Sequence, residues 1–214
     1  MTSENTFNLI RILLVDDHAV VRAGYRRLLE QASSCWAVTE ASSGEAAYQA
    51  CVHAEFDVVV MDISLPGISG LETLARLRRR DPKIRVLIFS MHEEPVFAEH
   101  ALSNGAAGYI TKSSAPEVLV EAVQRVSVGR HYLGPNVCCQ HGDPAPAALQ
   151  GLSPREFEIF RLLAEGRGSD EIARLLSISY KTVANYGSGI RDKLALNNVA
   201  EMTRLAIRAG VIEA

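Results

Sequence analysis

Short apolar runs alternate, over the first 128 residues, with longer stretches in which apolar residues recur every three or four positions. The short runs are typical of buried strands, and the longer spacing is typical of amphipathic helices. Five strand-then-helix repeats predict a doubly wound, five-stranded parallel sheet that is covered by helices on both faces. The expected strands span residues 10–15, 36–40, 57–61, 85–90 and 108–111, and the expected helices span residues 19–31, 44–54, 70–80, 95–104 and 115–128.

The pattern changes after this α/β segment. Residues 129–150 are rich in Gly, Pro and Ala and follow neither period, which is typical of a linker. Beyond them the apolar spacing is helical throughout and predicts four helices, the first of which begins with Ser153 and Glu156 as a capping box. The sequence therefore predicts an α/β domain over residues 1–128, a linker, and an all-α four-helix domain over residues 151–214.

Composition excludes several classes of protein. Of the 214 residues, 48% are hydrophobic and 22% are charged, which is the composition of a soluble globular protein. Neither a secretory signal nor a membrane span fits the first residues, and four cysteines without framework spacing indicate a reduced, cytoplasmic protein. The net charge is −3, so overall basicity does not indicate nucleic-acid binding. The charge is nevertheless uneven, because nine basic and eight acidic residues after position 150 give +1.

Polar residues follow the apolar runs at the points where the expected strands end. Because parallel strands end at the same edge of a sheet, and ligands bind beyond their carboxyl ends, these side chains are expected to meet in one shallow pocket. For Asp16 or Asp17 alone, the alternative is an acidic residue that caps a helix. Chance placement of all five polar residues at strand ends is improbable. The five are Asp16 and Asp17 after the first strand, Asp62 after the third, Ser90 after the fourth and Lys112 after the fifth.

This set of side chains points to phosphoryl chemistry. Three carboxylates cannot lie together in their ionised form without a compensating cation, and oxygen-rich sites of this kind suit Mg²⁺. A carboxylate oxygen of Asp62 is then a nucleophile toward an incoming phosphoryl group, whose charge the metal and Lys112 offset. Pro66, Gly67 and Gly70 turn the chain away after this aspartate.

The motifs "DDH", "MDISLPGISG" and "GYITK", in this order and spacing, resemble the receiver domain of bacterial response regulators, over residues 10–128. The resemblance implies a flavodoxin-like fold in which Asp62 accepts a phosphoryl group from a sensor histidine kinase. The Mg²⁺ ligands that it implies are Asp16, Asp17, Asp62 and the backbone carbonyl of Ser64. The hydroxyl, lysine and switch-aromatic positions of the family match Ser90, Lys112 and Tyr109.

The expected helices after residue 168 fit a helix-turn-helix, because two short helices are joined by a tight turn and the second is longer and polar on one side. Val183, Ile190 and Leu194 are expected to face the core of this domain. Asn can hold adenine with two hydrogen bonds, and basic side chains and helix-start amides can bind phosphates. The pattern alone also fits a helical dimerisation or docking module. The expected DNA contacts are Lys181, Thr182, Asn185, Ser188, Arg191 and Lys193.

"LSPREFEIFRLLAEG", "DEIARLLSIS" and "KTVANY" resemble the LuxR-type output domain of the NarL/FixJ group of response regulators, over residues 151–212. The resemblance implies a tail that binds promoter DNA as a dimer. That group often carries Lys or Arg at the positions of Ala184, Gly187 or Gly189, so this chain lacks positive charge at these positions. We therefore hypothesise that dimerisation gates DNA binding and that Asn185 does more of the base reading than the charges do.

The last expected helix carries an apolar stripe that fits either core alone or core with a dimer contact, and we favour the second. The stripe is Val199, Met202, Leu205, Ala206 and Ala209.

The sequence predicts a phosphorylation-gated transcription regulator, and not an enzyme. One alternative is a Mg²⁺-dependent phosphohydrolase, although such enzymes usually carry a second acid at the position that Ser64 occupies. Another is an output domain that docks protein or RNA. The sequence does not decide whether phosphorylation releases the helix-turn-helix from the receiver or assembles a dimer.

Overall fold

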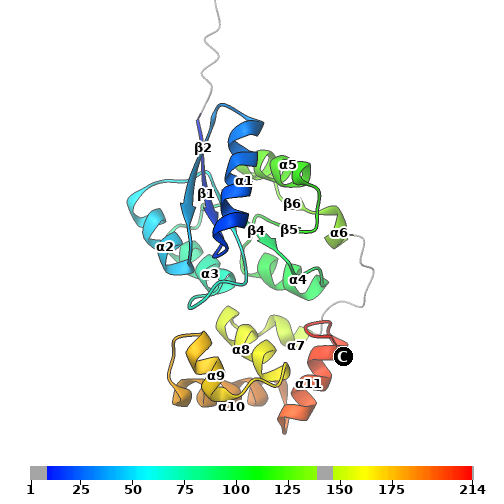
Figure 1. Ribbon diagram of the computed structural model, residues 1–214. Coiled ribbons are helices and arrows are strands. Elements are labelled where there is room, and N and C mark those ends of the chain that lie inside the picture. The colour runs from blue at the N-terminus through cyan, green and yellow to red at the C-terminus, as the bar shows by residue number, and fades with distance from the viewer. Residues whose placement is uncertain (1–8, 139–146, 214) are drawn as a thin grey trace, which may run out of the picture.

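The N-terminal domain is built around a single parallel sheet (Figure 1). The computed structural model describes residues 9–138 and 147–213. The strand order is β2-β1-β3-β4-β5-β6, and every pairing is parallel. The predicted doubly wound α/β fold is confirmed, with six strands where five were expected. The strands are β1 (Ile10–Val15), β2 (Trp36–Ala41), β3 (Val58–Met61), β4 (Val86–Ser90), β5 (Gly108–Thr111) and β6 (Tyr132–Leu133).

Helices cover both faces of this sheet and enclose two apolar layers. Side chains of α1 and α5 pack with Ile12 and Val60 on one face, and those of α2, α3 and α4 pack with Leu13 and Met61 on the other. All four residues of β3 are fully buried, which explains why this strand is apolar without alternation. The helices are α1 (Ala19–Ala32), α2 (Gly44–His53), α3 (Gly70–Arg80), α4 (Pro95–Ser103) and α5 (Pro116–Ser127).

The segment 129–150 contains regular structure, so the prediction of a linker was wrong for its described residues. Strand β6 joins the sheet edge beside β5, followed by α6 (Pro135–Cys138), and α7 (Ala147–Gln150) precedes the last domain. The Gly134 N–H donates to the carbonyl of Tyr109 at 2.8 Å. A Cβ on this glycine would lie 3.3 Å from the Cα of Ile110, so the chain passes very close to β5. A two-residue strand is too short to show alternation in the sequence.

Four helices form the C-terminal domain, as predicted. Ser153 and Glu156 form the capping box that was expected at the start of the first one. Helix α8 is central, because Phe157 and Phe160 on it are buried together with Ile190 and Met202 from two of the other helices. Among the described residues, no helix has the length and the apolar composition that crossing a membrane would need. The helices are α8 (Pro154–Ala164), α9 (Ser169–Leu175), α10 (Tyr180–Leu194) and α11 (Val199–Arg208).

Candidate functional site

Two aspartates and a lysine meet at the carboxyl ends of the central strands. Asp16 follows β1 and Asp62 follows β3, and their side chains are only 2% and 4% exposed. The Lys112 Nζ, which follows β5, lies 2.6 Å from Asp16 Oδ2 and 2.5 Å from Asp62 Oδ2. Sheet topology therefore brings together three of the five groups that the sequence singled out at strand ends.

The backbone around Asp62 holds this residue in a fixed position. Its N–H donates to the carbonyl of Val15 at 3.0 Å, and its Oδ1 accepts from the Ser64 N–H at 3.2 Å. Helix α3 begins directly against it, because a Cβ on Gly70 would lie 1.9 Å from the Asp62 carbonyl oxygen. Gly67 takes a φ of +76°, a conformation that favours glycine, and it completes the turn that leads away from the site.

Burial and the lysine act in opposite directions on the buried carboxylate. Burial raises the pKa of Asp62 above its usual value, although the hydrogen bond and the charge of Lys112 oppose the shift. Burial alone would lower the pKa of Lys112, but its hydrogen bonds to Asp16 and Asp62 outweigh that effect and raise it. One ammonium group therefore serves two buried carboxyl groups, and a further cation at this edge would stabilise the ionised form of both.

Asp17 lies beside this pair with a side chain that is 31% exposed. His18 Nδ1 lies 2.9 Å from Asp17 Oδ1 and 3.4 Å from Asp16 Oδ1. These three residues offer ligand atoms within 4.8 Å of one another, and Asp62 is linked to the group through Lys112. The carboxylates offer oxygen ligands of the kind that Mg²⁺ prefers. His18 was not among the predicted ligands, although the motif "DDH" contains it.

The predicted switch residues are both buried, and one loop connects them. Ser90 and Tyr109 have no exposed surface. The Tyr109 hydroxyl donates to the carbonyl of His92 at 2.8 Å, and the His92 N–H lies 3.2 Å from Ser90 Oγ, which accepts it. Burial raises the pKa of Tyr109, so its hydroxyl stays protonated as the donor. Sequence reasoning missed His92, because nothing in its local pattern marks a residue that acts through its backbone.

The outer side of α10 presents most of the predicted DNA contacts. Lys181, Asn185 and Ser188 are exposed, and Thr182 and Arg191 are half-buried. The core positions Val183, Ile190 and Leu194 are buried, as expected. Helix α10 begins after Ser179, whose Oγ accepts from the Thr182 N–H at 3.0 Å. Tyr180 is 57% exposed at this helix start, an aromatic side chain that sequence reasoning did not consider.

Two predicted features of the C-terminal domain come out differently. The Nζ of Lys193 lies 2.8 Å from Glu156 Oε2. This lysine, which was expected to contact a phosphate, therefore forms an ion pair with α8. Gly187 is buried, and a Cβ at this position would contact the Leu163 side chain of α8 at 3.4 Å. The position of Gly187 is therefore a packing position, and the charge missing from the DNA side concerns Ala184 and Gly189 only.

The apolar stripe of α11 divides between core and surface. Met202 and Ala206 are fully buried, and Leu205 and Ala209 are half-buried. Val199 is 44% exposed, so only this end of the stripe remains open to a second molecule.

Substituting Gly189 with alanine is expected to raise the free energy of unfolding of the C-terminal domain by about 0.5–1 kcal/mol, because glycine weakens a helix interior. A Cβ at this position meets open space, so the substitution adds no clash. Urea unfolding followed by circular dichroism measures the change. Gly187→Ala is the comparison at a buried position of the same helix, where the Cβ would make an ordinary contact with the Leu163 side chain at 3.4 Å. Equal or lower stability of Gly189→Ala would contradict the prediction.

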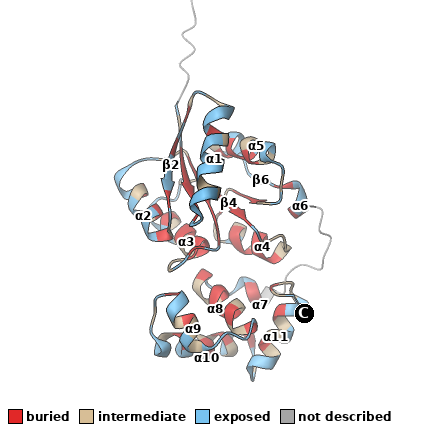
Figure 2. Ribbon diagram, in the orientation of Figure 1, coloured by how far each residue is buried: buried red, intermediate tan, exposed pale blue. Residues whose placement is uncertain are grey.

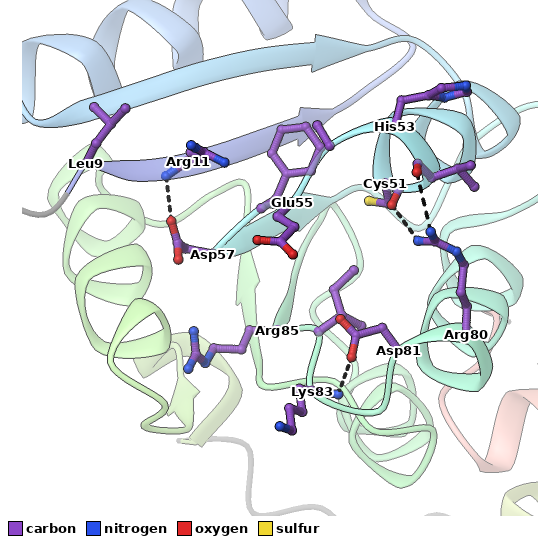
Figure 3. Close-up of a pocket in the computed structure, with 14 residues that line it drawn as sticks. Leu9, Arg11, Cys51, His53, Glu55, Asp57, Arg80, Asp81, Lys83 and Arg85 are labelled. Atoms are coloured by element: carbon purple, nitrogen blue, oxygen red, sulfur yellow. Dashed lines mark hydrogen bonds between the residues drawn. The ribbon is translucent and has the colours of Figure 1, made fainter.

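A large hollow lies where the strands of the sheet begin, at the end opposite to the buried lysine. It has a volume of about 1120 Å³ and is lined where strands begin, by Arg11, Asp57 and Arg85 (Figure 3). The Arg11 N–H donates to Asp57 Oδ2 at 2.8 Å, and the Lys83 N–H donates to Asp81 Oδ1 at 2.9 Å. Charges of both signs line the hollow, and the carboxylates of Asp57 and Asp81 accept backbone hydrogen bonds. The candidate site is therefore the opposite edge, where the buried lysine bridges two aspartates.

Comparisons with known proteins agree with both halves of this description. The family described as response regulator receiver domain matches residues 12–124, and the family described as bacterial regulatory proteins, luxR family, matches residues 150–206. Transcriptional activator protein ExaE of Pseudomonas putida is 44% identical over 211 residues, which cover 94% of this chain and 97% of that protein.

Solved structures extend the similarity to both domains. RcsB from Salmonella enterica serovar Typhimurium, bound to promoter P1flhDC in the presence of phosphomimetic BeF₃⁻, is 25% identical with a TM-score of 0.66, over 92% of this chain and 98% of that chain. A structure of two RcsB dimers bound to two parallel DNAs is 25% identical with a TM-score of 0.62, over 94% of this chain and 99% of that chain.

Proposed function

Because this chain belongs to the response regulators that join a receiver domain to a LuxR-family DNA-binding domain, we propose that phosphorylation of Asp62 controls its binding to promoter DNA. The observation that carries the proposal is the buried ammonium group of Lys112, which lies 2.5 Å from Asp62 Oδ2 and 2.6 Å from Asp16 Oδ2. A sensor histidine kinase is the proposed phosphoryl donor, and the cytoplasm, where promoter DNA lies, is the proposed place of action.

Each residue of the site is proposed to have a separate role in phosphoryl transfer. Asp16, Asp17, Asp62 and the Ser64 carbonyl would hold Mg²⁺, which when bound supplies charge neutralisation for the phosphoryl oxygens. A carboxylate oxygen of Asp62 forms the new bond to phosphorus as the bond between phosphorus and the donor's histidine nitrogen breaks. Lys112 places a second positive charge beside the transferred group. Burial of Asp62 limits access of water to the site.

The switch follows from the hydrogen bonds of one loop. Phosphoryl oxygens on Asp62 offer a charged acceptor to the hydroxyl of Ser90, which draws this hydroxyl toward them. The Ser90 Oγ also accepts from the His92 N–H, so the loop after β4 moves with it. Tyr109, which donates to the His92 carbonyl, then repacks. Only contacts that differ between the two states shift the equilibrium, and these are such contacts.

The C-terminal domain is proposed to read duplex DNA through α10 as part of a homodimer. Support comes from the exposed row of Lys181, Asn185 and Ser188 and from the RcsB dimers and promoter complex described above. The charge of +1 over residues 151–214 gives one copy little affinity for phosphates, so two copies on neighbouring half-sites are needed. Asn185 is proposed to read a base, and Lys181 to bind the backbone.

Two variants of the full-length protein test this assignment on its own promoter DNA. Asn185→Ala is expected to weaken binding to the specific site by about 5- to 100-fold and leave non-specific binding unchanged, as removal of a base contact does. Lys181→Ala is expected to weaken binding to all sequences alike and to lower the salt slope by about one. Binding is measured by mobility shift with Mg²⁺ and BeF₃⁻ at several salt concentrations.

The matched control is Lys83→Ala, which removes an exposed lysine from the N-terminal domain and is expected to leave binding unchanged. Unaltered binding of both α10 variants would contradict the assignment of the DNA-reading helix.

A further inference from the structure

Lys112, whose ammonium group serves two buried carboxylates, projects from a tight turn one residue beyond the end of β5. The Ser114 N–H donates to the carbonyl of Thr111 at 3.1 Å, which closes a β-turn over residues 111–114. The Lys112 N–H donates to the carbonyl of Ser90 at 2.7 Å, the last bond between the turn and the end of β4. The direction in which the Lys112 side chain leaves the backbone therefore depends on what holds this turn.

The segment 132–138, which we call the β5 strap, packs along the outer edge of β5. It comprises β6 and α6, which Figure 2 shows at this edge of the sheet. The strap is fixed to the sheet by the hydrogen bond from the Gly134 N–H to the carbonyl of Tyr109 and by Val137, which is only 9% exposed and belongs to the same apolar layer as Tyr109. The strap lies outside the residues that either family matches.

Asn136 of the β5 strap binds the turn at two points. Its Nδ2 lies 3.3 Å from Thr111 Oγ1 and 3.2 Å from Ser113 Oγ. The Thr111 Oγ1 also lies 3.0 Å from the Oγ of both Ser113 and Ser114. The Ser113 hydroxyl donates to Glu93 Oε1, so its oxygen is left to accept from the Asn136 amide. The hydroxyl groups of the turn and the amide of the strap thus form one connected network.

This network joins three segments around the phosphoacceptor edge. Glu93 lies in the loop between β4 and α4, three residues after Ser90, so its bond to Ser113 ties that loop to the turn. Asn136 ties the same turn to the strap. Asn136 and Ser113 are exposed, so water can replace their hydrogen bond and its net contribution to stability is small. The effect of this bond is therefore expected in the geometry of the turn.

We propose that Asn136 is a positioning residue for phosphoryl transfer, which holds the turn 111–114 so that the ammonium group of Lys112 lies beside the carboxylate of Asp62. The inference rests on the proposed function and adds to its site a residue from the segment between the two domains. Asn136 acts through the hydroxyl groups of the turn and not by touching the phosphoryl group. Without it, the turn samples more orientations, and fewer molecules have the geometry that the reaction requires.

The rate of phosphoryl labelling of the full-length protein by a small acyl phosphate with Mg²⁺ tests this role. Asn136→Ala is expected to lower the initial rate, read from the mass of the intact protein, by about three- to tenfold, because two hydrogen bonds that orient the turn are lost. Tyr132→Phe is the matched control in the same strap, because the hydroxyl that it removes donates to Glu121 Oε2 at 3.0 Å on α5. It is expected to label like the wild type. A fall in the stability of Asn136→Ala with an unchanged rate would overturn the proposal.

A double-mutant cycle tests whether Asn136 acts through the turn. Thr111→Val with Ser113→Ala removes both oxygens that accept from the amide. In this background, Asn136→Ala is expected to cause no further fall in the labelling rate, because the contact is already absent. The same three- to tenfold fall in both backgrounds would mean that Asn136 acts in another way, and would overturn the proposal.

The position of the lysine can also be observed without any phosphoryl group. Selective ¹⁵N-lysine labelling of the full-length protein gives four backbone amide signals, because the chain contains only Lys83, Lys112, Lys181 and Lys193. Lys112→Arg identifies the signal of Lys112 by its loss. Asn136→Ala is expected to shift this signal and to leave the other three in place, whereas Tyr132→Phe is expected to leave all four. An unshifted Lys112 signal in Asn136→Ala would overturn the proposal.

The two measurements separate this inference from the proposed function. If the wild type takes up no phosphoryl group while the Lys112 signal shifts in Asn136→Ala, the proposed function fails and the positioning of Lys112 by the strap remains. If the wild type is labelled and Asn136→Ala is labelled at the same rate, this inference alone fails.

Discussion

Phosphoryl labelling by a small acyl phosphate is expected to fall at least about 100-fold when Asp62 is replaced by asparagine, because the amide lacks the nucleophilic carboxylate oxygen. The substitution preserves the shape of the side chain, and the amide oxygen still accepts from the Ser64 N–H. Lys112 keeps its ion pair with Asp16, so the site stays folded. Labelling is measured by the mass of the intact protein with Mg²⁺ present, and the wild type is expected to take up one phosphoryl group.

Asp57→Asn is the matched control, since this carboxylate lies at the opposite edge of the sheet, where it accepts from the Arg11 N–H. Its labelling is expected to equal that of the wild type. The same incubation distinguishes a regulator from a phosphohydrolase, because a regulator stops at one group per chain while an enzyme continues to consume the phosphodonor. Equal labelling of Asp62→Asn and the wild type would place the phosphoacceptor elsewhere.

Removing the ammonium group of Lys112 is expected to have the largest effect on stability. Lys112→Met keeps the length of the side chain but leaves the buried carboxyl groups of Asp16 and Asp62 without their cation. Breaking a buried pair in this way costs about 3–5 kcal/mol, because an uncompensated charge remains inside the protein. Urea unfolding of the N-terminal domain measures the loss, and Mg²⁺ is expected to restore a part of it by binding the folded state.

The pH dependence of this variant has a defined sign. Burial already raises the pKa of Asp62, and loss of Lys112 removes the largest of the effects that oppose this shift. A carboxyl group with a higher pKa in the folded than in the unfolded state binds more protons when folded. The stability of Lys112→Met is therefore expected to rise as the pH falls toward the ordinary range of a carboxyl group, and to decrease as the pH rises through the raised pKa of Asp62.

Lys193→Met is the control for this experiment, since it removes a lysine from an ion pair with Glu156 in which Lys193 is 51% exposed. Exposed pairs contribute about 0–1 kcal/mol, so little change is expected. A similar loss in both variants, or a Lys112→Met protein whose stability is indifferent to Mg²⁺, would show that the buried charges are compensated in another way.

The meeting of Asp16, Asp62 and Lys112 could be predicted from the sequence because it is set by topology. Once the apolar runs were assigned to parallel strands, the residues after β1, β3 and β5 had to lie at one edge. No detail of packing was needed for Asp16, Asp62 and Lys112 to meet. The same reasoning could not find His92, whose backbone connects the two switch residues, because backbone hydrogen bonds of a loop leave no pattern in side-chain type.

Packing between the domains was also beyond the sequence. Phe97 and Phe157 fit the apolar spacing of their helices and were indistinguishable from core residues. Each instead fills space between two domains that are far apart along the chain. Gly187 was expected on the DNA side of α10, but it faces α8. Its position depends on the exact rotation of α10, which a period of three or four residues does not determine.

Strand β6 also has a consequence for solubility. It pairs with Gly108 and Tyr109, and thereby occupies backbone groups of β5 at the outer edge of the sheet. An uncovered edge strand offers its free N–H and carbonyl groups to strands of other molecules and favours aggregation. An isolated N-terminal fragment that stops at residue 128 would expose this edge, whereas a fragment extended to residue 138 would carry its own protection.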